Sequence, residues 1–286
     1  MGEEFARLSR NEKELALRVN VEIILELTDE FGFCAVTAPG GYWEIAPGKP
    51  AYYWLPEGYR EKQIEMLVKA LGKEILLIVN TGGVMAMPDA ANFVDFSIKL
   101  LTFPEEIDIN ARKTFEQGKK QLTKYANMGV EAFLSASDLG ESQNPYFSPE
   151  QMERFIYPYL SKWAEAVKEL GGFSILHSDG NINPYMDEIA DSGINALQAI
   201  DPTAKMDIAE LQMLYHERLC LCGNVDIGVL MMESPDEIYH AVKELLSCCG
   251  DKGSFIFGCS NAVQEDVPIQ NYLALVGAYK DFNSTE

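Results

Sequence analysis

The chain has 286 residues, of which 47% are hydrophobic, and its 44 acidic and 23 basic side chains give a net charge of −21. A surface this acidic repels phosphate backbones, so nucleic acid is not an expected partner. No run of about 18 uncharged apolar residues is present to form a membrane span, and the charged N-terminal segment lacks the apolar core of a signal peptide; we therefore expect a cytoplasmic protein with reduced cysteines.

Seven short apolar runs alternate along the chain with longer amphipathic stretches. Each run is rich in β-branched, aromatic or leucine residues and is followed by Gly, Pro, Asn or Asp, which is typical of buried parallel strands. The runs are Phe33–Val36, Glu74–Val79, Val130–Ser135, Phe173–His177, Ala196–Ile200, Arg218–Cys222 and Ser254–Gly258.

Helix signals lie between these runs. Ser148 and Ser234 each precede a proline, and Gln151 and Glu237 follow three residues after them, as in a capping box. Strand–helix alternation predicts a parallel α/β fold. We predict a TIM-type β/α barrel forming one domain over residues 1–286, incomplete or modified at the N-terminus because seven strands are visible instead of eight. An open doubly wound sheet is the alternative, although no GxGxxG motif follows any run.

One loop is unusually aromatic. Residues 40–59 follow the first run and contain two tryptophans and four tyrosines. In a barrel this loop would cover the mouth, where Trp43 would contact substrate; the alternative is that its aromatic side chains pack on the scaffold. We therefore take Trp43 as a candidate substrate-binding residue.

Polar side chains follow the predicted strands, and in a parallel barrel the carboxyl ends of the strands converge on one face. His177 ends the fourth run, and Asp179 lies two residues further, on the same side of an extended backbone. Cys259 directly follows the last run, which neighbours the first in a closed barrel. Because imidazole, carboxylate and thiolate are all zinc ligands, we predict a metal site formed by His177, Asp179 and Cys259.

Other strand ends add further candidates. Asp138 and Glu141 follow the third run and are candidate catalytic carboxylates, as a fourth metal ligand or a substrate contact; capping and turn formation are the alternative roles. Cys222 is a competing metal ligand, or a core cysteine. Candidate substrate-binding residues at the remaining strand ends are Asn80, Asn224 and Asp226.

Several of these segments resemble the uroporphyrinogen decarboxylase superfamily. They are HSDGN at residues 177–181, NVD at 224–226, FGCSNAVQEDVP at 257–268 and ASDLGESQNPYFSPE at 136–150. The resemblance implies a β/α barrel. It also implies either a decarboxylase or a zinc-dependent methyltransferase that works with a corrinoid cofactor.

The resemblance is closer to the methyltransferase branch. The chain has no arginine-rich N-terminal segment like the one with which the decarboxylases bind their substrate's carboxylates, and Cys259 stands where they have a histidine. The methyltransferases carry a His-x-Cys motif and a distant cysteine as zinc ligands. His177 and Cys259 match two of these positions, and Asp179 replaces the middle cysteine. The resemblance therefore implies zinc, a corrinoid carried by a partner protein, and a homodimer.

The aspartate suggests a direction for the chemistry. A carboxylate in place of a thiolate leaves zinc more electrophilic, which suits activation of an oxygen leaving group. We therefore hypothesise transfer of a methyl group from a small methylated donor, such as a methyl ether, to the corrinoid protein. The alternatives are a decarboxylase with Asp138 as its charged anchor, methyl transfer from methylcobalamin to a thiol, and a non-catalytic corrinoid- or metal-binding partner.

Overall fold

The computed structural model describes residue 5 and residues 7–38, 41–46, 49–56, 58–250 and 253–284, with the backbone alone in 41–46 and 49–54. The chain divides into two compact units. Unit 1 comprises residues 1–81, 120–134 and 170–172, and unit 2 comprises residues 82–119, 135–169 and 173–286. Because the two units alternate along the chain, no single cut separates them, and the single-domain assignment stays a prediction.

Within the described residues, seven strands form the main sheet in the order β1-β4-β5-β6-β7-β8-β9, which follows the order of the chain. All seven predicted runs overlap these strands, and every described pairing between them is parallel. The prediction of a parallel β/α fold with seven recognisable strands is therefore confirmed. The strands are β1 (Ala35–Thr37), β4 (Leu76–Asn80), β5 (Ala132–Ala136), β6 (Phe173–Ser178), β7 (Ala196–Ala199), β8 (Cys220–Val225) and β9 (Phe255–Cys259).

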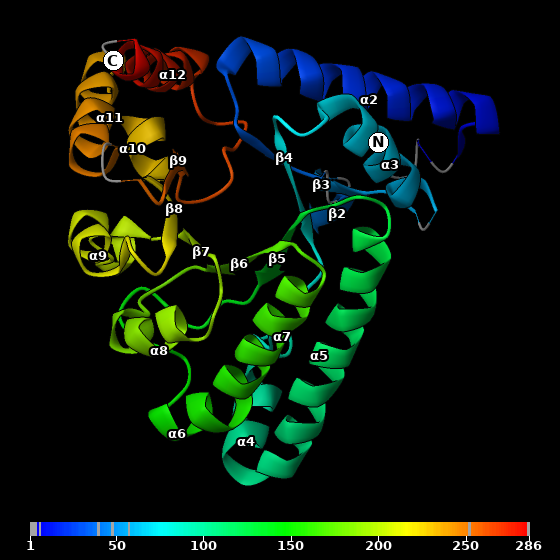
Figure 1. Cartoon of the computed structure of the whole chain (residues 1–286), viewed down its shortest axis with the longest axis vertical. Helices are drawn as coiled ribbons and strands as arrows, with labels where there is room; N and C mark the ends of the chain where they lie inside the picture. Colours follow the sequence, from blue (N-terminus) through cyan, green and yellow to red (C-terminus); the bar gives the residue numbers. More distant parts are fainter. Residues whose placement is uncertain are drawn as a thin grey trace. The chain divides into compact units, whose positions relative to one another are not determined.

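Unit 1 contains α2 (Arg10–Phe31) and α3 (Tyr59–Leu71) together with β1 and β4; both helices and β4 are labelled in Figure 1. Ser9 and Glu12 form a capping box at the start of α2. The segment expected to be a loop is instead an antiparallel hairpin of β2 (Gly41–Ala46) and β3 (Lys49–Trp54), since its aromatic-rich sequence also suits cross-strand pairing. The side chain of Trp43 lies outside the described residues, so its role stays a prediction.

Unit 2 contains β6 to β9 and most of the helices. Figure 1 shows α8, α9, α10 and α11 on one side of these strands. The predicted capping boxes are confirmed, because Ser148 begins α6 and Ser234 begins α11. The helices that follow α3 along the described chain are α4 (Phe93–Thr102), α5 (Pro104–Ala126), α6 (Pro149–Gln151), α7 (Tyr157–Glu169), α8 (Met186–Asp191), α9 (Ile208–Tyr215), α10 (Ile227–Met232), α11 (Pro235–Cys249) and α12 (Ile269–Asn283), of which α5 passes from unit 2 into unit 1 after residue 119.

The core of unit 2 is apolar and closely packed. Trp163 and Leu160 of α7 are fully buried, as are Leu176 of β6, Leu197 of β7 and Leu221 of β8. Close packing of these side chains fixes the positions of the strands. The residues at the carboxyl ends of the strands are therefore held in defined positions. Among the described residues, no helix has both the length and the apolar composition that crossing a membrane requires.

Candidate functional site

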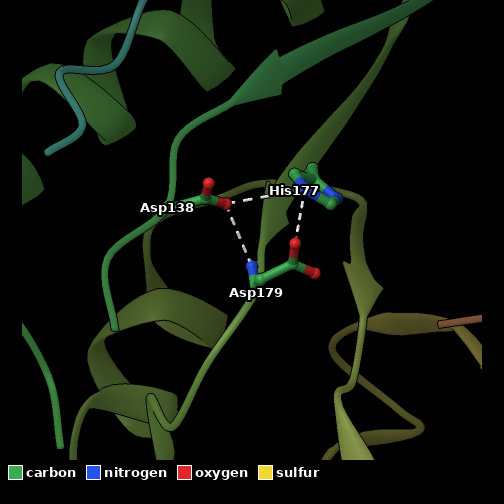
Figure 2. A group of neighbouring side chains, drawn as sticks. All are labelled: Asp138, His177 and Asp179. Atoms are coloured by element: carbon green, nitrogen blue, oxygen red, sulfur yellow. Dashed lines mark hydrogen bonds and ion pairs between the residues drawn. The ribbon is translucent and has the colours of Figure 1, made fainter. Parts of the chain in front are cut away.

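Two aspartate side chains and one histidine side chain of unit 2 lie close together just beyond the carboxyl ends of β5 and β6. Asp138, His177 and Asp179 each offer one ligand atom, and these three atoms all lie within 4.8 Å of one another (Figure 2). His177 Nε2 is 3.5 Å from Asp138 Oδ1 and 3.8 Å from Asp179 Oδ2. The structure therefore brings together two predicted metal ligands and a carboxylate predicted to be catalytic or a fourth ligand; we call these three residues the strand-end cluster.

Backbone hydrogen bonds position the cluster. The Ser137 amide donates to the carbonyl oxygen of His177 at 2.9 Å, and the Asp179 amide donates to Asp138 Oδ1 at 3.1 Å. The two loops then approach so closely that a Cβ on Gly180 would lie 2.2 Å from the carbonyl oxygen of Gly140. Gly180 also has φ +83°, a conformation that favours glycine. A glycine at residue 180 is thus needed for Asp179 to reach Asp138.

His177 is oriented by a residue that the sequence analysis did not select. Its Nδ1 atom is hydrogen-bonded to Gln198 Oε1, and Gln198 Nε2 donates to the carbonyl oxygen of Ser260 at 3.3 Å. The available signal was the position of Gln198 as the one polar residue of the apolar run Ala196–Ile200. A glutamine inside a buried strand needs hydrogen-bond partners, which marks it as a candidate support for a site.

Burial and the neighbouring side chains both act on the pKa of Asp179. Burial is the largest influence on Asp179 and raises its pKa; the nearby Asp138 carboxylate raises it further, whereas His177 and a 2.9 Å hydrogen bond from Asn261 Nδ2 lower it. The side chains of His177, Asp179 and Asp138 are 18%, 34% and 50% exposed, so the cluster is reachable from solvent. A cation held between them would offset the repulsion between the carboxylates.

The donor set fits zinc. Histidine nitrogen and aspartate oxygen are both ordinary zinc ligands, and bonds of about 2.0–2.2 Å in a tetrahedral site keep ligand atoms roughly 3.3–3.6 Å apart. The observed separations of 3.5 and 3.8 Å from Nε2 are close to that range. Three protein ligands would leave one coordination position for a substrate, as in catalytic zinc sites.

Cys259 is not part of the strand-end cluster. It lies at the end of β9 near Tyr272 of α12; burial raises the pKa of the Tyr272 hydroxyl, and the Cys259 thiol adds to this rise. Burial raises the pKa of Cys259 itself to about 11, so its thiol is protonated at neutral pH. The competing ligand Cys222 is buried in β8 and is also outside the cluster. Both ligand assignments stay predictions.

Three of the four remaining predicted site residues make structural hydrogen bonds through their side chains. Glu141 accepts from the Asn144 amide at 2.7 Å, and backbone amide donors, with Gln143 the largest influence, lower its pKa. Asp226 accepts from the Val229 amide at 2.8 Å and caps α10. The other two are Asn224, which is buried and donates to the Ile200 carbonyl at 3.0 Å, and Asn80, which is exposed at the end of β4 in unit 1. Their catalytic and substrate-binding roles stay predictions.

Residues 58–282 match the model of the family "Uroporphyrinogen decarboxylase (URO-D)", and the chain therefore belongs to this family. A uroporphyrinogen decarboxylase of Coxiella burnetii is 27% identical over 162 residues, which are 56% of this chain and 44% of that protein. The methylcobamide:CoM methyltransferase MtaA of Methanosarcina barkeri is 24% identical over 227 residues, which are 77% of this chain and 62% of that protein. The chain thus spans about half the length of the curated relatives it matches.

The fold class is confirmed by a solved structure. A methyltransferase from Methanosarcina mazei superposes with a TM-score of 0.61 at 20% identity, covering 93% of this chain and 86% of that one. At this identity the likeness establishes the TIM-type β/α fold. The resemblance seen in the sequence is confirmed, and both the decarboxylase and the methyltransferase branches are represented among the relatives.

Proposed function

We propose that this protein is a zinc-dependent methyltransferase that moves a methyl group from a small methylated donor, such as a methyl ether, to a corrinoid protein. The observation that carries the proposal is the convergence of one imidazole nitrogen and two carboxylate oxygens in the strand-end cluster. Membership of a family with a methylcobamide-dependent relative supports it.

The residues in and around the cluster have different proposed roles. His177 Nε2 and the carboxylates of Asp138 and Asp179 would hold zinc, which supplies Lewis acidity that weakens the bond between the donor's oxygen and its methyl group. Asn261 holds Asp179 through Oδ2, at 2.9 Å. Asp138, whose side chain is half exposed, is the member most open to contact with a donor.

The transfer balances without a further reactant. The reduced corrinoid of the partner protein, as methyl acceptor, would supply the electron pair for the bond to the methyl carbon, and the donor's oxygen would keep the pair of the bond that breaks. The product alkoxide or phenoxide then takes a proton from solvent. Two carboxylate ligands in place of thiolates would leave a bound zinc more electrophilic, which is why we place an oxygen leaving group at this site.

Metal content and methyl transfer test the proposal. We expect the purified protein to bind about one zinc ion per chain and to methylate cob(I)alamin from at least one member of a methyl ether panel, followed by the change in the cobalamin spectrum. Asp179→Asn should abolish both. Asp207→Asn is the matched control, because an amide also caps α9 at that position. Transfer from methylcobalamin to a thiol, with no ether used, would reverse the proposed direction.

A second candidate is decarboxylation of a porphyrinogen, favoured by the 27% identity to a uroporphyrinogen decarboxylase. Asp138 would be its charged anchor. Carbon dioxide release from uroporphyrinogen by the metal-free protein, retained in Asp179→Asn and lost in Asp138→Asn, would support this candidate. Corrinoid or metal binding without turnover of any donor would instead indicate a non-catalytic partner.

A further inference from the structure

Gln198 of β7 lies between the strand-end cluster and the last strand of the sheet. It stands in register with His177 of β6 on one side and with Cys222 of β8 on the other. Its amide has two partners, His177 Nδ1 through Oε1 and the Ser260 carbonyl oxygen through Nε2, the latter at 3.3 Å. The side chain therefore bridges His177 and the segment that follows β9.

The chemistry of these partners sets the direction of each hydrogen bond. A backbone carbonyl only accepts, so the NH2 end of Gln198 must face Ser260 and the oxygen must face His177. Since Oε1 also only accepts, His177 Nδ1 must carry a hydrogen. In the neutral ring, Nε2 then holds a lone pair, and it points at the carboxylates of Asp138 and Asp179 (Figure 2).

We propose that Gln198 is a positioning residue that holds His177 in its Nδ1–H tautomer and so makes Nε2 the metal-binding atom. Without an acceptor at Nδ1, the ring would instead place its hydrogen on Nε2, because Asp138 Oδ1 lies 3.5 Å away and would accept it. That tautomer has no lone pair facing the cluster. The part of this inference that concerns metal rests on the proposed function, whereas the part that concerns the tautomer does not.

Nitrogen-15 NMR of metal-free protein with labelled histidines tests the tautomer directly. The chain has three histidines, and the signals that are missing from the spectrum of His177→Ala identify those of His177. With the rings neutral, we expect hydrogen on Nδ1 of His177 in the wild type and in Gln198→Glu, whose carboxylate still accepts. We expect hydrogen on Nε2 in Gln198→Met, which is similar in length but cannot accept. An Nε2–H tautomer in the wild type, or no change in Gln198→Met, would overturn the inference.

Zinc affinity, measured by competition with a chelator, supplies the second readout. Gln198→Met should bind zinc about 10–100-fold more weakly than the wild type, as expected for loss of a partner behind a metal-binding histidine. Gln198→Glu should restore most of that affinity even though it gives up the donation to Ser260. Equal weakening in both variants would indicate a structural role alone and contradict the proposal.

Gln212→Met is the control for loss of a buried glutamine. Gln212 is buried, and its amide donates a hydrogen bond to the Gly253 carbonyl at 2.6 Å. No hydrogen bond described for Gln212 involves His177 or Gln198. This variant should leave the His177 tautomer and the zinc affinity unchanged. If the tautomer responds to Gln198 as expected while no variant, wild type included, binds zinc, the proposed function fails and the tautomer inference stands.

Discussion

At the end of β6, His177 faces two carboxylates, whereas at the end of β9 Cys259 lies near α12. The difference follows from the phase of each strand. The ring of Phe257 stacks on Tyr279 of α12 with centroids 5.4 Å apart, and Cys259, two residues later, shares the same face of β9. His177 belongs instead to the face that carries Gln198. A potential zinc ligand at a strand end can thus contribute to the cluster only if its side chain lies on the face of the sheet that carries His177.

The largest expected effect is the loss of zinc binding when the histidine at the end of β6 is removed. His177→Ala should weaken zinc binding by more than about 100-fold, because losing a ligand exceeds the 10–100-fold cost of losing a ligand's partner. His240→Ala removes an exposed histidine from α11 and should leave zinc binding unchanged. Chelator competition measures both; full zinc affinity in His177→Ala would remove the imidazole from the site.

The loops that carry the cluster offer the next contrast. Gly180→Ala should destabilise the protein by about 1–3 kcal/mol and weaken zinc binding, since the new Cβ would meet the Gly140 carbonyl at 2.2 Å. Gly193→Ala is the matched control: its φ is +89°, but its Cβ would meet only Ala164 Cβ at 4.0 Å. Gly193→Ala should lower the folding stability through backbone strain and leave the zinc affinity unchanged. Urea unfolding and chelator competition are the measurements; equal zinc loss in both variants would contradict the close-approach argument.

The thiol of Cys259 should respond to pH, not to zinc. Its pKa is raised to about 11, so alkylation by iodoacetamide should accelerate roughly tenfold per pH unit until about pH 11. The rate for a free thiol would level off near its own pKa of about 8.5. Site-resolved mass spectrometry can follow it, with the exposed Cys248 as internal reference. Added zinc should not slow the labelling. Protection by zinc, or zinc loss in Cys259→Ser, would instead make Cys259 the ligand that the sequence predicts.

The smallest expected effect concerns Asp226. Asp226→Ala should cost about 1 kcal/mol of folding stability through loss of the α10 cap, and Asp226→Asn should retain it, because asparagine caps a helix equally well. Thermal unfolding of the two variants checks this. Methyl transfer that falls in Asp226→Asn without a change in stability would restore the predicted substrate contact.

Much of the architecture could be predicted because it depends on local patterns. The apolar runs indicated the seven strands described in the main sheet, and Ser148 and Ser234 marked two helix starts, since burial and capping act on residues close in sequence. The pairing of β2 with β3 was missed because an aromatic-rich sequence suits a loop or a strand equally well.

The sequence by itself determined that a histidine and an aspartate two residues apart would share one side of a strand end, because the side-chain period of an extended chain is two. Only the tertiary structure decided which distant residues complete that pair. Asp138 joins it because the Gly140 and Gly180 loops meet without side chains between them, and Gln198 supports it through strand register. Such contacts depend on the packing of separate strands, which local sequence does not encode.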